Sequence, residues 1–252
     1  MTPERTSTHR VRYPFISRKN KNRLKDSALR YPYHVFENFI FRFKAKKFYG
    51  QTAEDALLQR LLPEKDGSYF DIGGGHPIKF SNTYAFYRRG WSGISVDAIK
   101  FNTIIYRFMR PRDTSIHALI GESNEMTDFY VFEPYGLSTA DPEIATNVMK
   151  IKDVRLLETI QLPTVGLSEI MPSVNPSRAS FLSIDVEGLD LQVLKTNDWS
   201  RFRPRVICVE NWGGVQNSTT SGIAAYLNSK NYRLHAFTGL SEIYIANDYS
   251  ST

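Results

Sequence analysis

The stretch from Ser68 to Asp97 constrains the fold more than any other part of the chain. Its sequence, SYFDIGGGHPIKFSNTYAFYRRGWSGISVD, predicts a strand over Ser68–Ile72, a triple-glycine loop, a helix over Ser81–Arg89 and a strand over Gly93–Asp97. Glycines let the backbone turn sharply and approach a ligand closely. A helix after such a loop offers free N–H groups to an anion, and an acid ending the second strand can accept hydrogen bonds from ribose hydroxyls. The stretch therefore predicts half of a nucleoside-cofactor fold.

The glycine spacing distinguishes between nucleoside cofactors. A dinucleotide loop needs G-x-G-x-x-G, and Ile78 occupies the position of its third glycine; the Gly-Lys-Ser/Thr of a P-loop is absent. S-adenosylmethionine carries no pyrophosphate, so a shorter loop can hold it, and Asp71 can face its ammonium group. A plain strand-to-helix turn is the alternative interpretation of the glycines alone. The predicted contacts to this cofactor are Asp71, Gly73, Gly74, Gly75, His76, Ser81 as a helix cap, Asp97, Gly121, Glu122 and Asp185.

Three longer motifs resemble those of FkbM-type S-adenosylmethionine-dependent methyltransferases. They are DIGGGHPIKFSNTY with RGWSGISVD over 71–97, FLSIDVEG over 181–188, and RPRVICVE over 203–210. The resemblance spans about residues 50–246. It implies a class I methyltransferase fold, which is a Rossmann-like α/β fold with a mainly parallel sheet and a terminal antiparallel hairpin. It also implies methyl transfer to oxygen, often on a sugar hydroxyl of a glycan or natural product.

The remaining sequence alternates strands and helices, which predicts a mainly parallel sheet. Further strands are expected at Ser115–Ile120, Ala179–Val186, Arg205–Glu210, Tyr232–Phe237 and Glu242–Ala246. The last two are separated by a link too short for a crossover, so they must pair antiparallel. Helices are expected at Thr52–Leu62, Lys100–Arg110, Leu189–Thr196 and Thr219–Asn228. An additional antiparallel pair is expected at Asp128–Phe132 and Glu158–Pro163.

Positive charge is concentrated at the N-terminus. Residues 1–50 contain 13 Lys/Arg and 3 Asp/Glu, whereas the rest of the chain contains 19 and 23, giving the net charge of +6. From Tyr33 to Phe48, apolar residues recur at helical spacing among basic ones. We therefore expect a basic arm and helix over 1–50 and a methyltransferase domain over 51–252. The helix either packs on the domain or contacts a membrane surface or a protein. Nucleic acid is not an expected partner, because no nucleic-acid motif accompanies the charge.

The cellular setting is predicted from what the sequence lacks. Cys208 is the single cysteine, so no internal disulfide can form. No apolar run approaches the roughly 20 residues that cross a bilayer, and the N-terminus has no secretory signal. We expect a reduced cytoplasmic setting, with a membrane-peripheral position if the basic arm binds lipid.

Acids at the ends of predicted strands are the candidates for chemistry. Ligands of open α/β sheets bind beyond the carboxyl ends of the strands, where Asp97, Asp185 with Glu187, and Glu210 are expected. An alcohol is a poor nucleophile, so a base or a metal must help to remove its proton. Asp185 and Glu187 project to one side of an ideal strand, as a base or as ligands of a divalent cation. The sequence shows no third metal ligand, so the metal ligands are unknown and the support for a metal is weak.

His76 is the rival base, or a partner for the carboxylate of the cofactor. The predicted contacts to a sugar or glycan acceptor are Glu210, Asn211, Tyr135, Ser138 and Thr139. Two other functions remain open. A nicotinamide-dependent oxidoreductase would share the first half of the fold, but Ile78 and the terminal hairpin disfavour it. A non-catalytic scaffold in a glycan-assembly complex would keep the fold without the chemistry.

Overall fold

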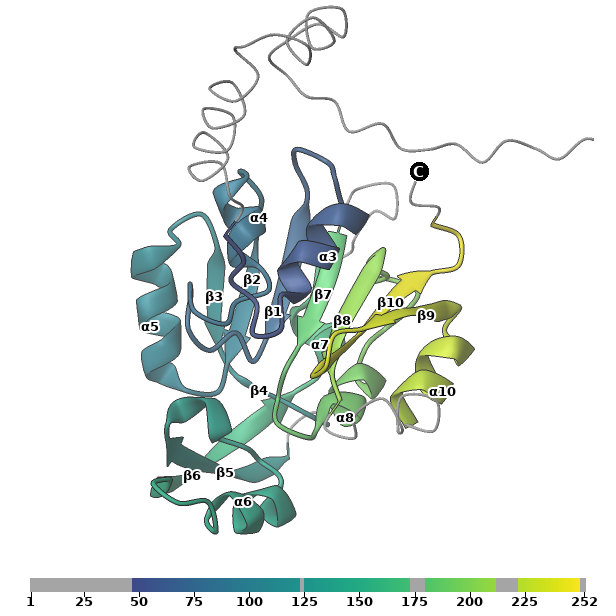
Figure 1. Cartoon of the computed structure of the whole chain (residues 1–252). Helices are drawn as coiled ribbons and strands as arrows, with labels where there is room; N and C mark the ends of the chain where they lie inside the picture. The colour runs from purple at the N-terminus through teal and green to yellow at the C-terminus, as the bar shows by residue number, and fades with distance from the viewer. Residues whose placement is uncertain (1–46, 123–124, 173–179, 212–221, 250–252) are drawn as a thin grey trace, which may run out of the picture. The chain divides into compact units, whose positions relative to one another are not determined.

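The computed structural model describes residues 47–122, 125–172, 180–211 and 222–249 (Figure 1). Contacts divide the chain into two units, Met1–Lys47 and Phe48–Thr252, and nearly all described residues belong to the second. The helix expected over Tyr33–Phe48 lies outside the described residues, apart from its last two positions. Within the described ranges, no helix is long and apolar enough to span a bilayer.

A seven-stranded sheet forms the centre of the second unit (Figure 1). Its order is β3-β2-β1-β7-β8-β10-β9, and the first five strands run parallel, whereas β10 pairs antiparallel with both β8 and β9. This arrangement confirms the predicted fold class, including the terminal hairpin. The strands are β1 (Ser68–Ile72), β2 (Ser92–Asp97), β3 (Thr114–His117), β7 (Ser180–Ile184), β8 (Val206–Glu210), β9 (Tyr232–Phe237) and β10 (Ser241–Ala246).

Helices cover both faces of this sheet, because successive side chains of a buried strand point to opposite faces. Phe70 and Ile72 face the core shared with α7 (Leu167–Ile170), α8 (Asp190–Lys195) and α10 (Gly222–Ser229). Tyr69, between them, faces the core shared with α3 (Glu54–Leu61) and α4 (Tyr84–Arg88). Helix α5 (Lys100–Met109) lies along the outer part of the sheet beside β3 (Figure 1).

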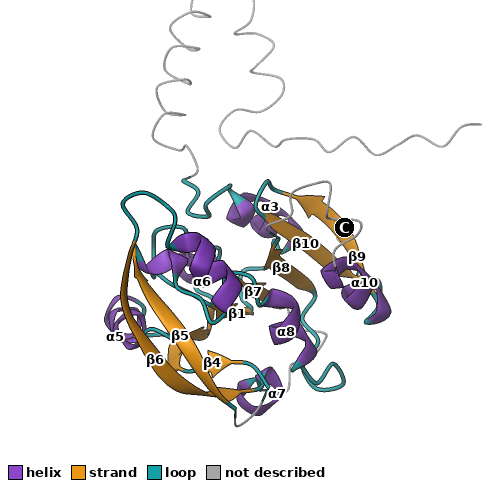
Figure 2. Cartoon of the chain, turned by 90° about the horizontal axis from the view of Figure 1, so that it is seen from below, coloured by secondary structure: helices purple, strands orange, loops and turns teal. Residues whose placement is uncertain are grey.

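A second, three-stranded sheet lies below the carboxyl ends of the parallel strands (Figures 1 and 2). It consists of β4 (Leu119–Ile120), β5 (Met126–Glu133) and β6 (Arg155–Val165), with the short helices η1 (Tyr135–Leu137) and α6 (Pro142–Val148) between β5 and β6. The predicted antiparallel pair is confirmed, and each strand is longer than expected. The prediction of a single strand over Ser115–Ile120 is wrong, because the chain leaves the main sheet after His117 and joins the small sheet at Leu119.

The helix expected over Ser81–Arg89 begins later, at Tyr84, so it does not follow the glycine loop directly. Ser81 Oγ accepts a hydrogen bond from the N–H of Tyr84 at 3.1 Å, and Ser81 is buried beneath the loop. Its predicted role as a cofactor contact is therefore not supported by its position. The intervening residues form a loop whose path is fixed by buried polar contacts.

Arg110 is the centre of these contacts. Its side chain is fully buried, Nε pairs with Asp113 Oδ2 at 2.7 Å, and Nη1 donates to Thr83 Oγ1 at 3.0 Å. Thr83 Oγ1 in turn donates to Asp71 Oδ2 at 2.7 Å, and the hydroxyl of Tyr106 donates to the same oxygen at 3.1 Å. Burial raises the pKa of Asp71, and these donors oppose that effect. Asp71 thus anchors the loop from below.

We expect Arg110→Met to lower the free energy of unfolding by about 3–5 kcal/mol, because it leaves Asp113 buried without its charged partner. Arg112→Met, at an exposed position two residues along, should cost about 0.5 kcal/mol or less. Urea unfolding followed by circular dichroism measures both. A loss of similar size in the two variants would show that the buried network does not hold the loop.

Candidate active site

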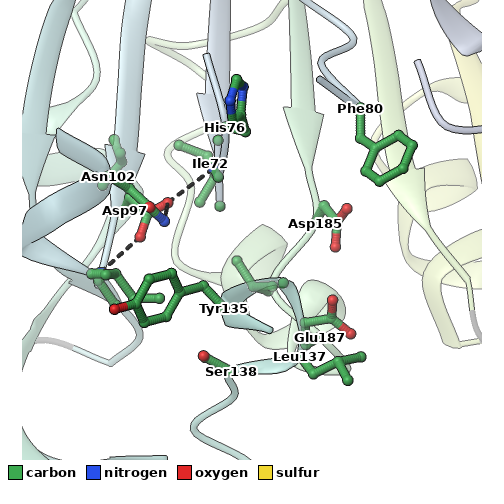
Figure 3. Close-up of a pocket in the computed structure, with 18 of the residues that line it drawn as sticks. Ile72, His76, Phe80, Asp97, Asn102, Tyr135, Leu137, Ser138, Asp185 and Glu187 are labelled. Carbon is green, nitrogen blue, oxygen red and sulfur yellow. Dashed lines mark hydrogen bonds between the residues drawn. The ribbon is translucent and has the colours of Figure 1, made fainter. Parts of the chain in front are cut away.

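A cavity of about 780 Å³ opens where the carboxyl ends of the main sheet face the small sheet (Figure 3). Its size lies within the range of small-molecule sites, about 300–1,000 Å³. It is lined by the loop after β1, the ends of β2 and β8, the β7–α8 turn, and the segment around η1. Of the sequence-predicted residues, those that line it are Gly73, Gly74, Gly75, His76, Asp97, Tyr135, Ser138, Asp185, Glu187, Glu210 and Asn211.

The glycine loop makes the close approach that its sequence predicts. Gly73 has a φ of 77°, and a Cβ at this position would lie 1.7 Å from the carbonyl oxygen of Asp185. Only glycine therefore lets the end of β1 lie against the end of β7. The N–H of Gly75 donates to Asp97 Oδ2 at 2.9 Å, which ties the loop to the end of β2.

Asp97 is the polar centre of one side of the cavity (Figure 3). Its Oδ1 accepts the N–H of Ile99 at 2.7 Å, and its Oδ2 accepts the Nδ2 of Asn102 at 2.9 Å in addition to the N–H of Gly75. Burial raises the pKa of Asp97 to about 6. A carboxylate oxygen can accept two hydrogen bonds, so Oδ1 has capacity for one more. That capacity fits a ribose hydroxyl.

An apolar wall beside Asp97 was not predicted from the sequence. Ile99, Leu119 and Phe129 belong to one buried cluster and also line the cavity, where they can contact a flat ring. Two of the predicted cofactor contacts, Gly121 and Glu122, do not line the cavity. The N–H of Gly121 binds the carbonyl of Val165, so these two residues belong to the junction with β6. The expected third strand is divided into β3 and β4, so Gly121 and Glu122 follow a strand of the small sheet and not one of the main sheet.

Three carboxyl groups meet on the opposite side of the cavity, where Figure 3 shows Asp185 and Glu187. Asp185, Glu187 and Glu210 each place one oxygen within 4.8 Å of the others. Burial, followed by repulsion from Glu210, raises the pKa of Asp185 well above its usual range. Burial and the charge of Asp185 raise the pKa of Glu187 to about 9. Asp185 and Glu187 therefore hold protons more tightly than ordinary carboxyl groups do.

A turn, rather than strand geometry, brings the acid cluster together. Strand β7 ends at Ile184, and Glu187 has a φ of 55°, a left-handed conformation that costs about 1–2 kcal/mol in a non-glycine residue. Thr139 Oγ1 donates to the carbonyl of Glu187 at 2.9 Å, and Asp190 Oδ2 accepts the N–H of Gly188 at 3.3 Å. Thr139, predicted to contact an acceptor, is buried outside the cavity lining and supports this turn instead.

His76 lines the cavity with one ring nitrogen already engaged. Its Nδ1 accepts the N–H groups of Ile78 and Lys79, each at 3.0 Å. A neutral imidazole that accepts at Nδ1 carries its proton on Nε2, so it is a donor there. The other predicted residue of this region, Asp71, lies beneath the loop and does not line the cavity. Its predicted contact with an ammonium group has no support from this position.

Three of the predicted acceptor residues, Tyr135, Ser138 and Asn211, line the cavity with an aromatic ring and polar groups. Tyr135 is 43% exposed, whereas Ser138 and Asn211 are buried. Ser138 Oγ accepts the N–H of Phe132 at 3.0 Å, and Asn211 Nδ2 donates to Glu242 Oε1 at 2.7 Å. Each polar side chain is therefore held in a fixed orientation at the cavity, as specific recognition requires.

Three solved structures that are similar to this chain are methyltransferases of low sequence identity. A TehB-like SAM-dependent methyltransferase from Corynebacterium glutamicum is 10% identical (TM-score 0.39; 85% of this chain and 99% of that chain covered). A precorrin-6y C5,15-methyltransferase from Geobacter metallireducens is 12% identical (TM-score 0.40; 80% and 89% covered). The 1,6-didemethyltoxoflavin-N1-methyltransferase of Burkholderia thailandensis, solved with bound 1,6-didemethyltoxoflavin and S-adenosylhomocysteine, is 9% identical (TM-score 0.38; 93% and 91% covered).

Sequence comparison is more specific. No curated protein sequence matches the chain significantly. A family model, the methyltransferase FkbM domain, matches residues 71–234, which is more than half of the chain. The matched region includes the glycine loop, Asp97 and all three members of the acid cluster. This chain is therefore a methyltransferase and belongs to the FkbM family, as the motif resemblance predicted.

Proposed function

We propose that this methyltransferase transfers the methyl group of S-adenosylmethionine to a hydroxyl of a sugar, glycan or natural product. One observation carries the proposal: the cavity has a ribose-type site at Asp97 on one side and an acid cluster on the other. Methyl transfer to a hydroxyl needs both, because the donor must be aligned and the hydroxyl must lose a proton.

The residues on the Asp97 side fit the cofactor. The remaining acceptor capacity of Asp97 Oδ1 suits a ribose hydroxyl, and the apolar wall of Ile99, Leu119 and Phe129 suits the adenine ring. The glycine loop lies between this side and the acid cluster, since Gly73 contacts the carbonyl of Asp185. A ligand held at Asp97 and along the loop would reach the cluster with its other end.

The acid cluster supplies the chemistry that an alcohol needs. S-adenosylmethionine bound along the glycine loop would supply the methyl group, and its sulfur would keep the electron pair of the broken bond, while the hydroxyl oxygen would supply the pair of the new bond. Asp185 takes the hydroxyl proton in this proposal, because its Oδ1 is buried and accepts no hydrogen bond from the described part of the chain. A cation nearby favours the ionised carboxylate, so a bound sulfonium would lower the raised pKa of Asp185.

His76 suits a binding role better than the role of base. Its Nδ1 is occupied by two backbone N–H groups, so it has no free lone pair with which to accept a proton. The Nε2–H can donate to an anionic group such as a carboxylate. For the acceptor, Tyr135 offers an aromatic face, and Ser138 and Asn211 offer polar groups, a combination that suits a sugar or a hydroxylated natural product.

Asp97→Ala should weaken the binding of S-adenosylmethionine by about 1–3 kcal/mol, the range for losing a hydrogen bond to a charged group. Calorimetric titration of the purified protein measures this effect, and NAD serves as the competing ligand. Asp128→Ala, an exposed acid on β5 outside the cavity, is the matched control and should bind as the parent does. Unchanged affinity in Asp97→Ala would rule out the ribose contact.

Asp185→Asn should keep cofactor affinity and lower turnover about 10²–10⁴-fold, the usual contribution of a general base. The assay uses an acceptor that mass spectrometry identifies from a panel of sugars and natural products by one added methyl group. His76→Ala should retain most of the parent turnover, because Nδ1 is already occupied.

Two further outcomes of that assay show which group removes the proton of the acceptor hydroxyl. A chelator stops the reaction only if the acid cluster holds a divalent metal, and full activity with chelator assigns Asp185 as a direct base. An active Asp185→Asn variant beside an inactive His76→Ala variant that still binds cofactor would move the base to the glycine loop.

The raised pKa of Glu187 makes stability pH-dependent. Its folded-state pKa of about 9 exceeds the ordinary value of 4.5, so between these values the folded state binds more protons than the unfolded state. The free energy of unfolding contributed by Glu187 therefore falls as pH rises through this range. Gln cannot ionise, so Glu187→Gln should have a higher melting temperature than the ligand-free parent near pH 9 and a similar one near pH 5. The difference near pH 9 should be about 2–4 °C for each kcal/mol of unfolding free energy that the parent loses when Glu187 ionises. Exposed Glu143→Gln is the control. An equal difference at both pH values would contradict the burial of this acid.

A further inference from the structure

Helix α5 buries its polar face and exposes its apolar face. The inward residues Thr103, Tyr106 and Arg110, the last directly after the helix, are at most 2% exposed. On the outer side, Phe101, Ile104 and Phe108 recur at helical spacing and are 54%, 53% and 85% exposed. A helix on the surface of a globular protein normally has the opposite arrangement. We call the outward residues the α5 stripe: Phe101, Ile104, Ile105, Phe108 and Met109.

Within residues 98–117, the exposed charged side chains all have one sign. Between residues 98 and 117 the exposed Lys and Arg side chains are Lys100, Arg107 and Arg112. Asp113, the one acid in this range, has a side chain only 1% exposed and is paired with Arg110. An apolar stripe with cationic side chains beside it is the pattern of a helix that lies in the surface of an anionic bilayer.

The α5 stripe is continuous with the mouth of the cavity. Phe101 and Ile105 belong to the stripe and also line the cavity, and the ring of Phe101 lies 6.4 Å from the ring of Tyr135. Phe80, on the opposite part of the lining, is 59% exposed, with Lys79 Nζ 4.6 Å from its ring centre. Exposed apolar side chains with a cation nearby therefore lie on two parts of the cavity lining.

We propose that the α5 stripe binds the surface of a bilayer that contains anionic lipids, with the cavity entrance toward the headgroups. Phe108, the most exposed of the stripe residues, inserts most deeply, and Lys100 and Arg107 contact lipid phosphates. A second copy of the chain fits less well, because stripe-to-stripe pairing would bring like charges together. If the proposed function holds, the acceptor is then a hydroxyl of a lipid-linked or amphiphilic molecule; the membrane contact itself does not depend on that function.

Sedimentation of the full chain with vesicles of phosphatidylcholine, with and without phosphatidylserine, tests the proposal. The parent should bind, more strongly with phosphatidylserine, and Ile104→Ser/Phe108→Ser should lower the partition coefficient about tenfold or more on both vesicles. Neither residue lines the cavity. Met149→Ser/Ile151→Ser is the control. It removes two apolar side chains that are 49% and 48% exposed and lie beside Lys150 and Lys152 in the sequence, and this variant should bind vesicles as the parent does.

Several outcomes would contradict the membrane contact. Equal vesicle binding by the parent and Ile104→Ser/Phe108→Ser, equal loss in both double variants, or no binding by the parent overturns the proposal. So does gel filtration that shows a parent dimer separated into monomers by the stripe substitutions, since the stripe would then join two chains. Melting temperature verifies the fold of each variant, and Phe108→Ser alone replaces the double variant if that unfolds. Cofactor titration reports separately on the proposed function.

Discussion

The buried pair of Arg110 and Asp113 is the constraint on which the cofactor side of this molecule depends. Arg110 reaches Thr83, Thr83 reaches Asp71, and Tyr106 donates both to Asp71 and to the carbonyl of Gly74. The contacts to Thr83 and Asp71 are buried, so each would be costly to break without replacement. Helix α5 is thereby fixed to the glycine loop through the polar residues of its inward face.

A second constraint ties the cofactor loop to the acid cluster. The missing Cβ of Gly73 allows direct contact with the carbonyl of Asp185, so the glycine loop lies against the end of β7. Thr139 and Asp190 hold the turn that gives Glu187 its left-handed conformation. Burial, together with the charges of neighbouring acids, raises the pKa of Asp185 and of Glu187. This is unfavourable for the ligand-free fold above neutral pH and useful beside a cationic methyl donor.

Local sequence patterns predicted the parts of the site that depend on the backbone. Three glycines predicted the close approach, and acids at the ends of β2 and β8 predicted side chains at the cavity edge. Predictions failed where a residue's surroundings come from distant segments. Ser81 follows the loop in sequence, but its hydroxyl is bound by the buried Arg110. Gly121 follows β4, which pairs in the small sheet, so it does not lie at the edge of the main sheet as predicted.

The sequence by itself determined the α/β class, the terminal hairpin and the membership of the FkbM family, because hydrophobic periodicity, link lengths and long motifs are local properties of the chain. Only the tertiary structure decided that Glu210 joins Asp185 and Glu187, that Asp71 and Thr139 support the site from outside its cavity, and that α5 is apolar on its outer face. Such facts depend on which segments pack together, since burial and charge proximity are set by neighbours that are remote in sequence.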